Sequence, residues 1–435
     1  MLKFPRRSPK KPIQTWFIVA IAVVLTILIG CGISPFTSNA TAAQTQVFEQ
    51  AWETINTQFF DPNFNGVDWK AQREKYRAAA TQAKSPEAFA DVINQMLADL
   101  KTSHTRYYIP SETAYYQLLG IFQPRSRDLK NLPKTIFPNG KLEYSGIGIF
   151  TKTLEGKTFV SGVLEGSPAA QAGLLAGDEI LSADGKPFQQ VQSFSGKVNQ
   201  PVQLKIQRQA SSSSSQEITV TPKLFNPLTM FLDTQKASNR IIQQDGKKLG
   251  YVHIWSYAGD QYQDQLEEDL FYGPLKDADG LILDLRNGWG GAPLDALNIY
   301  TARGPSITSI PRNRQRYVYR AQWNKPVVML VNEGSRSAKE ILAYGFQKYK
   351  IGTVVGSKTP GAVVAGRAFL MQDGSLLYVA VADVYVDDKT RLEGVGVAPD
   401  IEVPFSLPYA QGADPQKERA IAVLLQQVSQ TTTVP

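Results

Sequence analysis

Two serines follow a short apolar segment, at a point where a strand is expected to turn into a helix. Residues 327–331 are continuously apolar, and Ser335 and Ser337 come just before a segment with helical spacing. A serine at a helix N-terminus lies among free backbone N–H groups, which stabilise the negative oxygen that forms during acyl transfer. Serines are also common helix caps, so this segment taken alone favours the capping role.

The chain contains only two histidines, and one of them is suited to proton transfer. His104 follows Ser103 in a loop, just after a helix that is expected to end near Leu100. An imidazole with an ordinary pKa near 6.5 can accept a proton at neutral pH and return it. His253 lies in a strand-like run, which favours a place in the core or on a sheet face.

The elements that must position these residues begin with a helical region, residues 46–142. Four apolar side chains recur there at helix spacing, namely Phe48, Trp52, Ile55 and Phe59. Ser85 followed by Pro86 and Glu87 is a start signal for a second helix. The loop that carries His104 therefore extends from the end of this second helix.

Short β-type runs and glycine turns follow over residues 143–223. Three segments resemble a PDZ domain: Ser145-Gly146-Ile147-Gly148-Ile149, Gly166-Ser167-Pro168-Ala169-Ala170-Gln171-Ala172-Gly173-Leu174 and Gly177-Asp178-Glu179-Ile180-Leu181. The resemblance implies a groove in which N–H groups at Gly146 and Gly148 receive a terminal carboxylate, while Ile147 and Ile149 line the pocket for the last side chain. The two glycines alone would mark an ordinary tight turn.

Apolar strands alternate with helices over residues 224–405. Strands are expected at 281–285 and 327–331, and helices after Pro293 and through Phe346. Strands that are apolar on both faces form a sheet covered by helices. The expected fold class is α/β (α+β), with an N-terminal helical region, a PDZ-like β-rich domain and a helix-covered mixed sheet. The C-terminal tail, residues 406–435, carries one expected helix near 415–427.

Residues 45–405 resemble the C-terminal processing or tail-specific serine peptidase family. Ser337 falls on the second serine of the family's Ser-x-Ser-Ala-x-Glu-Ile motif, and residues 284–291 are similar to its strand and glycine-rich loop. The resemblance implies a core of the tail-specific protease or ClpP-crotonase type, and an acyl-enzyme on Ser337. It also implies an oxyanion hole made by the N–H groups of Gly290 or Gly291 and of Ala338. No metal or organic cofactor is implied.

One position departs from the family's best-known branch, which uses a lysine as general base. Ala362 stands at that position and cannot accept a proton, and Lys358 falls on a different one. The departure resembles the tricorn-like branch, in which a histidine is the base. There the matching residues are His104 as base, with Ser103 and Glu393 holding the orientation and charge of its imidazole. A solvated loop histidine is the alternative for His104.

The first 30 residues indicate export. Five of the charges behind the net charge of +7 lie among the first eleven residues, and without them 41 basic residues face 39 acidic ones, so a nucleic-acid partner has little support. An uncharged apolar run over 13–29 precedes Cys31, the only cysteine. Leu28-Ile29-Gly30-Cys31 resembles a bacterial lipoprotein cleavage box, which implies lipidation of Cys31 and anchoring to the membrane. Cleavage after Ala42 and a retained anchor are the alternatives, and residues 31–45 suit a flexible tether.

These patterns together predict an exported serine endopeptidase of the cell envelope. Its substrates would be polypeptides, with their C-terminal ends presented by the PDZ module. Two other hypotheses stay open: a catalytically silent relative that binds peptides or apolar ligands, and a PDZ scaffold that regulates other proteases. The resemblance also leaves a homo-oligomer open.

Overall fold

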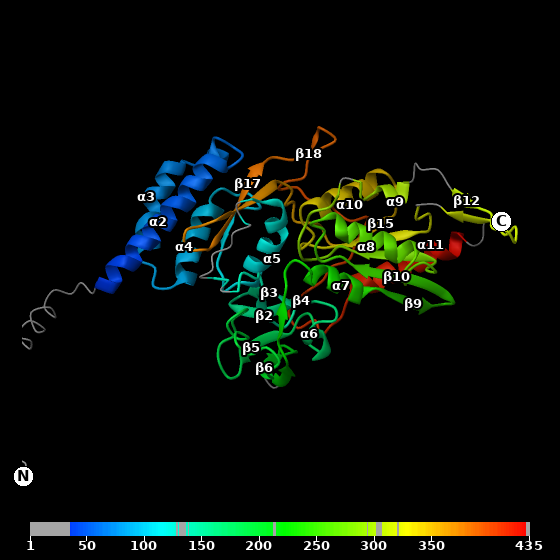
Figure 1. Cartoon of the computed structure of the whole chain (residues 1–435), viewed down its shortest axis with the longest axis horizontal. Coiled ribbons are helices and arrows are strands. Elements are labelled where there is room, and N and C mark those ends of the chain that lie inside the picture. The colour runs from blue at the N-terminus through cyan, green and yellow to red at the C-terminus, as the bar shows by residue number, and fades with distance from the viewer. Residues whose placement is uncertain are drawn as a thin grey trace, which may run out of the picture.

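The computed structural model describes residues 35–127, 129, 136–137, 139–211, 215–293, 295–301, 307–319 and 322–431. Figure 1 shows N-terminal helices in blue, a β-rich part in cyan and green, and an α/β part in green, yellow and red. The expected export signal and Cys31 lie outside the described residues. Within the described ranges, no helix combines the length and the apolarity that a membrane crossing requires.

Three helices form most of the N-terminal part: α2 (Pro35–Gln58), α3 (Trp69–Thr81) and α4 (Pro86–Ala98). The side chains of Asp68 and Ser85 accept hydrogen bonds at the starts of α3 and α4, which fixes where these helices begin. The apolar faces of the three helices share one core. Because α4 ends shortly before Leu100, residues 101–105 form the loop beyond it, as predicted.

Helix α2 begins earlier than the sequence analysis expects. Residues 35–45 are helical, whereas a flexible tether is expected over 31–45. Proline is tolerated at the first position of a helix, and Ala40, Ala42, Ala43 and Gln44 are strong helix formers. The serine and threonine content of this segment therefore does not prevent helix formation.

The β-rich part has the order of elements β2 (Tyr144–Gly146), β3 (Ile149–Leu154), β4 (Lys157–Val163), α6 (Pro168–Gln171), β5 (Glu179–Ala183), β6 (Val202–Gln207), β7 (Ser215–Val220) and β8 (Lys223–Phe225). Strands β3 to β7 form one antiparallel sheet in sequence order, and β2 pairs with β8. Strand β3 is at the edge of this sheet, so its outer side has no partner strand among the described residues.

The α/β part is built on a six-stranded sheet of order β20-β15-β14-β11-β10-β9. Its strands are β9 (Arg240–Gln244), β10 (Lys247–His253), β11 (Gly280–Asp284), β14 (Val327–Val331), β15 (Thr353–Gly356) and β20 (Ile401–Glu402). All neighbours are parallel except β9 and β10. Alternate side chains of β14 belong to two different cores, so both faces of the sheet are buried, as the continuous apolar strands predict.

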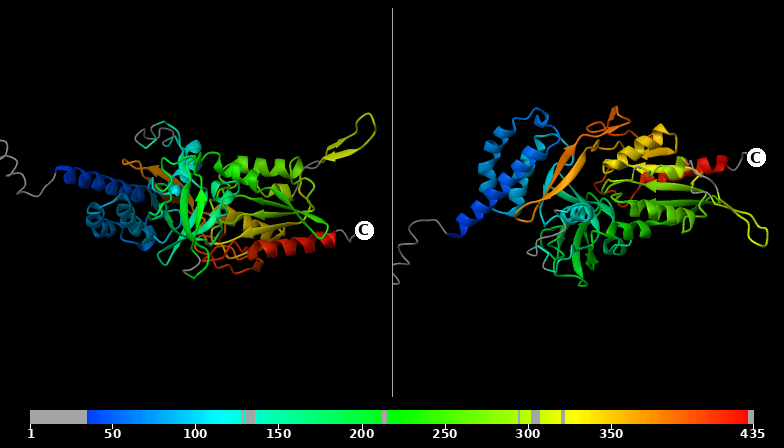
Figure 2. Two further views of the ribbon diagram at one scale, coloured as in Figure 1. Left: turned by 90° about the horizontal axis from the view of Figure 1, so that it is seen from below. Right: turned by 45° about the horizontal axis from the view of Figure 1, so that its top comes forward.

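Helices cover both faces of this sheet. The helices of the α/β part are α7 (Met230–Ser238), α8 (Asp260–Phe271), α9 (Asn298–Thr301), α10 (Ala338–Lys348) and α11 (Pro415–Thr431). The helix expected after Pro293 is the short α9. Helix α11 packs Ala420, Val423 and Leu424 onto the sheet, and Figure 2 shows it in red along one face. The segment expected as a C-terminal tail is therefore a structural layer of the core.

A small sheet joins the N-terminal part to the α/β part. Its strands are β1 (Arg106–Tyr108), β17 (Leu376–Ala382) and β16 (Ala365–Leu370), in that order. Figure 1 shows β17 between the blue helices and the α/β part. Since β1 starts two residues after His104, its pairing with β17 carries the histidine loop to the α/β part.

The remaining described elements are the buried helix α5 and several short helices and strands. They are η1 (Phe64–Gly66), α5 (Thr113–Phe122), η2 (Gln123–Arg125), β12 (Ile307–Ser309), β13 (Tyr317–Tyr319), β18 (Tyr385–Val386) and β19 (Thr390–Arg391). Strands β12 and β13 pair as a hairpin that projects from the α/β part in both views of Figure 2.

Candidate active site

Ser337 lies at the turn between β14 and α10. Its backbone has φ 60° and ψ −132°, a conformation that residues other than glycine rarely adopt and that costs roughly 1–3 kcal/mol. The Ser337 N–H donates to Ala362 O at 2.8 Å and faces Glu340 Oε1 at 3.3 Å. Such strain persists only where neighbouring groups hold it, and it is concentrated at functional sites.

The neighbouring Ser335 has a different role. Its side chain is fully buried, its hydroxyl donates to Leu285 O at 2.9 Å, and it accepts from the Asn332 N–H at 3.0 Å. These bonds fasten the turn to the end of β11. Of the two serines that the sequence analysis considers as caps, Ser335 is therefore fixed in the scaffold of the turn.

A buried glutamate of α10 holds the strand-to-loop segment that faces Ser337. Glu340 Oε2 accepts from Thr359 Oγ1 at 2.6 Å and from the Gly361 N–H at 2.7 Å, while Oε1 accepts from the Ala362 N–H at 2.7 Å. Burial raises the pKa of Glu340, although these hydrogen bonds oppose the rise. In the sequence, Glu340 is part of the Ser-x-Ser-Ala-x-Glu-Ile motif, and nothing there predicts these contacts.

The glycine-rich loop lies directly against Ser337. A Cβ on Gly290 would overlap the Cβ of Ser337 and would come within 2.6 Å of Arg336 O and 3.2 Å of Ser337 Oγ. Only glycine fits at this position. Ala338 is the first residue of α10, so its N–H has no acceptor within the helix. The backbone of the glycine-rich loop and the first turn of α10 thus lie next to Ser337.

Lys339 holds the glycine-rich loop in place. Its side chain is fully buried, and Nζ donates to Asn287 O at 2.8 Å and to Trp255 O at 3.1 Å. The Trp289 N–H also donates to Trp255 O, at 2.7 Å. Burial lowers the pKa of Lys339 to about 7. The role of Lys339 was not predicted, because nothing in the sequence indicates which carbonyl groups it contacts.

His104, Ser103 and Glu393 form a hydrogen-bonded chain. Ser103 Oγ lies 2.8 Å from His104 Nδ1 and donates to Glu393 Oε2 at 2.9 Å, and the Ser103 N–H donates to Glu393 Oε1 at 2.9 Å. His104 has a φ of 54°, and its ring lies 5.3 Å from the ring of Tyr378 in β17. The structure thus brings together three residues from segments nearly 300 positions apart.

One short segment links this chain to Ser337. Glu393 Oε2 accepts from the Val363 N–H at 2.6 Å, and the preceding carbonyl, Ala362 O, accepts from the Ser337 N–H. Residues 359–363 therefore lie between two buried glutamates. Ala362 stands in this segment where the sequence analysis notes the missing lysine, and Lys358 is exposed.

The environment of His104 lowers its pKa to about 4. The main cause is burial, and the positive charge of Arg336, next to Ser337, adds to it. Both effects favour the neutral imidazole. A neutral imidazole is the form that can accept a proton from a serine hydroxyl.

This shift predicts where activity is lost on acidification. If His104 is the base, kcat/KM stays level from neutral pH downward and falls about tenfold per pH unit only below roughly pH 4, because protonation removes the acceptor. The measurement is a kcat/KM profile on an unstructured peptide, with circular dichroism at each pH to separate acid unfolding. An acid limb near the ordinary histidine value of about 6.5 would contradict this environment.

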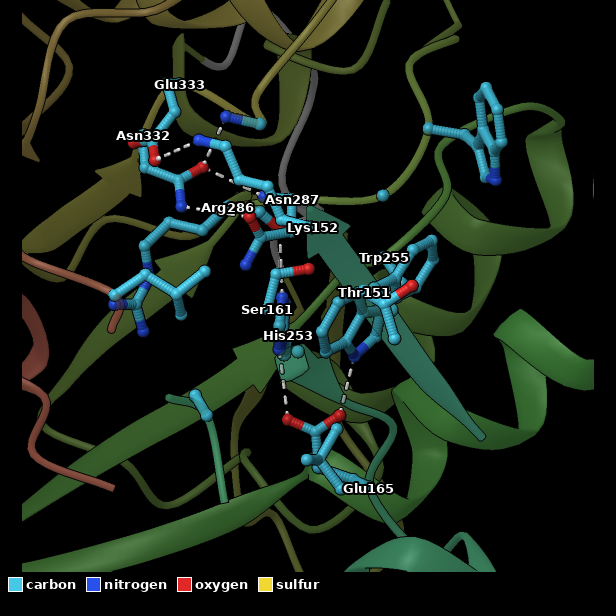
Figure 3. A pocket seen from close by; sticks show the side chains of 18 of the residues that line it. Thr151, Lys152, Ser161, Glu165, His253, Trp255, Arg286, Asn287, Asn332 and Glu333 are labelled. Atoms are coloured by element: carbon cyan, nitrogen blue, oxygen red, sulfur yellow. Dashed lines mark hydrogen bonds and ion pairs between the residues drawn. The ribbon is translucent and has the colours of Figure 1, made fainter. Parts of the chain in front are cut away.

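A cavity of about 610 Å³ lies between the PDZ-like part and the α/β part. It is lined by residues of β3, β4 and β10, by the glycine-rich loop, and by Arg336. In Figure 3, the carboxylate of Glu165 reaches across to His253 and Trp255, with Oε1 3.0 Å from His253 Nδ1 and Oε2 2.6 Å from Trp255 Nε1. His253 is therefore a buried residue at the end of β10 that joins the two parts.

The residues of the expected PDZ groove lie along a narrow hollow. Gly146, Ile147, Gly148 and Ile149 line it, but its volume is only about 10 Å³. Gln190 donates to Thr151 Oγ1 at 3.0 Å and accepts from the Thr113 N–H at 3.1 Å, which closes the hollow against the N-terminal part. A peptide would have to displace Gln190 to add to β3.

Comparisons with known proteins agree with this architecture. Residues 248–403 match the model of peptidase family S41, residues 41–98 that of the tricorn protease C1 domain, and residues 159–208 that of the PDZ domain. A carboxyl-terminal-processing protease of Synechocystis is 27% identical, over 95% of this chain and 94% of the relative. The chloroplastic carboxyl-terminal-processing peptidase 3 of Arabidopsis thaliana is 29% identical, over 81% of this chain and 67% of the relative.

Two solved structures share the fold. The crystal structure of the tricorn protease has a TM-score of 0.52 at 18% identity and covers 89% of this chain, which covers 37% of it. Mature CPAF complexed with lactacystin has a TM-score of 0.51 at 13% identity, with coverage of 90% and 99%. These likenesses confirm the predicted fold class. The chain thus carries a peptidase family S41 region, a PDZ domain and a tricorn C1-type region, and these similarities indicate a serine-type peptidase.

Proposed function

We propose that Ser337 is the nucleophile of this peptidase and that His104 is its general base. Ser103 and Glu393 then orient the imidazole and balance its charge in the transition state. The observation that carries the proposal is the continuous set of hydrogen bonds from His104 through Ser103 and Glu393 to Val363, whose neighbour Ala362 accepts from the Ser337 N–H.

The reaction follows from these positions. Ser337 Oγ attacks the peptide carbonyl while His104 accepts its proton, and the resulting oxyanion is stabilised by the Ala338 N–H and by the N–H of Gly290 or Gly291. His104 then donates the proton to the leaving amine as the C–N bond breaks, which leaves an acyl-enzyme on Ser337. A water deprotonated by His104 hydrolyses the ester and restores the serine.

The substrates proposed are polypeptides that are cut near their C-terminal ends. Two observations support this proposal. The similar proteins of Synechocystis and Arabidopsis thaliana are carboxyl-terminal-processing proteases, and the chain carries a PDZ domain. PDZ domains add an extended peptide to an edge strand and hold its terminal carboxylate on backbone N–H groups. Strand β3 offers such an edge next to the cavity.

An extracytoplasmic location is proposed together with this activity. The basic and apolar N-terminal segment supports export, and Cys31 supports attachment to the membrane through a lipid. These residues precede α2, so an anchor there would leave the peptidase outside the cytoplasm. A further proposal is that the chain forms a homo-oligomer.

A fluorophosphonate label tests the proposed nucleophile. The probe phosphonylates serines that are activated by a neighbouring base, so peptide mass spectrometry of the labelled folded protein should find the adduct on Ser337. Ser335 is the internal control, because its hydroxyl is buried and donates to Leu285 O. A folded protein that takes up no label would favour a catalytically silent peptide-binding protein.

A further inference from the structure

Arg336 stands out among the cavity residues because its charge has no acidic partner among the residues that the structure describes. It directly precedes Ser337 and lines the cavity between the PDZ domain and the α/β part. Its guanidinium lies 5.3 Å from the centre of the Trp289 ring. Its Nε is buried and has no hydrogen-bond acceptor in the part of the chain that the structure describes.

Three other cations of the same cavity are neutralised by carboxylates. The pairs are Arg106–Glu112 at 3.0 Å, Lys152–Glu333 at 3.7 Å, and Arg286 with Asp284 and Asp414, both at 2.7 Å. The ion pairs within the described residues do not include Arg336. A half-buried guanidinium without a counter-charge is unfavourable in the free protein, and a bound anion would relieve this cost.

Arg240 and Lys417 also line the cavity without an ion pair among the described residues, but their surroundings differ. Both lie over the ring of Tyr251, at 3.9 Å and 5.4 Å. The positive charge of Arg336 instead lowers the pKa values of His104, Tyr108 and Tyr378. At His104 this adds to the effect of burial, whereas at the two tyrosines it opposes burial, which raises the pKa. Arg336 thus faces the residues around the proposed base.

We propose that Arg336 binds a carboxylate of the substrate within a few residues of the bond that is cut. This carboxylate is either an acidic side chain or the chain's own C-terminal carboxylate. The inference rests on Ser337 as nucleophile. Because Arg336 directly precedes Ser337 in the sequence, a carboxylate that Arg336 binds would lie close to the bond that is cut. A planar guanidinium can donate two parallel hydrogen bonds to a carboxylate, and the nearby ring of Trp289 stabilises the cation.

The test uses a set of short unstructured peptides that differ in charge alone. One series replaces glutamine by glutamate at each position around the cleaved bond, and the other compares a free C-terminal acid with its amide. Wild type should cleave one of the charged forms with a kcat/KM about tenfold to a hundredfold higher than its neutral partner, as expected for a hydrogen-bonded ion pair. The first series identifies a side-chain carboxylate, and the second identifies a terminal one.

Variants then assign the preference to Arg336. The R336Q variant should reduce the ratio of the two rates to about one, and R336E should favour lysine in place of glutamate at the same position. The matched control is R240Q, which removes another unpaired cation of the cavity and should keep the wild-type ratio. Equal cleavage of charged and neutral peptides by wild type, or a ratio that survives in R336Q, would overturn the proposal.

Failure of the catalytic assignment would look different. In that case S337A would cleave the peptides at a rate close to that of wild type, whatever their charge. A preference that disappears in R240Q but not in R336Q would place the carboxylate at Tyr251 and would also overturn the inference.

Discussion

Replacing Ser337 by alanine is expected to lower kcat/KM by about 10⁴-fold or more. The reason is that the variant lacks the oxygen that forms the acyl-enzyme, while the N–H groups of Ala338 and the glycine-rich loop still polarise the substrate carbonyl. Residual cleavage should therefore resemble that of a water molecule attacking in a prepared oxyanion hole. The measurement is the rate at which peptides are released from an unstructured protein, followed by mass spectrometry.

Ser335 supplies the control for this variant. Replacing Ser335 by alanine removes two hydrogen bonds at the same turn, to Leu285 O and from the Asn332 N–H, and should cost about 1–3 kcal/mol of folding stability. Its fluorophosphonate label on Ser337 should persist. A Ser337→Ala protein that folds and keeps its activity within tenfold would exclude the acyl-enzyme, and an unchanged cellular phenotype would support the scaffold hypothesis.

The fold could be predicted where side-chain periodicity decides it. Strand β14 has the bounds that its apolar run indicates, and α4 ends at Ala98, close to the expected end near Leu100. In both elements, the residues that meet the core are set by local spacing. The early start of α2 was not predicted, because the serine and threonine content of residues 35–45 suggested a tether. The helix near 415–427 was predicted, but its packing onto the sheet depends on residues far away in the sequence.

The pairing of distant residues needed the structure. Ser103 and Glu393 are 290 positions apart, and only the family resemblance connects them in the sequence. The structure adds the physical connection, since β1 pairs with β17 and brings the histidine loop to Glu393. It also shows residues that no motif marks, such as Glu165, which joins the PDZ domain to His253.

Charge compensation is another property that a sequence does not reveal. The chain has nearly equal numbers of acidic and basic residues beyond its N-terminal segment, so composition suggests no excess charge at any site. In the cavity, however, Arg106 and Arg286 have acidic partners while Arg336 has none among the described residues. A local imbalance of this kind depends on three-dimensional neighbours and points to what a substrate must supply.

Replacing His104 by alanine is expected to lower kcat/KM by about 10³-fold to 10⁴-fold. Without the imidazole, the base that Ser103 and Glu393 hold in place is missing. The hydroxyl of Ser337, whose unperturbed pKa lies far above neutral pH, then attacks slowly. The acid limb near pH 4 should vanish with the histidine, because that limb reports its protonation. Added imidazole should restore part of the rate, since the variant leaves a space next to Tyr378.

His253 is the control, because it is the other histidine of the chain and its side chain is also shielded from solvent, more fully than that of His104. A His253→Asn variant loses the contact with Glu165 between the PDZ domain and the α/β part, yet it leaves the set of His104, Ser103 and Glu393 in place. Its rate should fall by about tenfold or less, and the acid limb should stay near pH 4. If His104→Ala lost no more activity than His253→Asn, proton transfer by His104 would be excluded, because one variant removes the base and the other only a contact between domains.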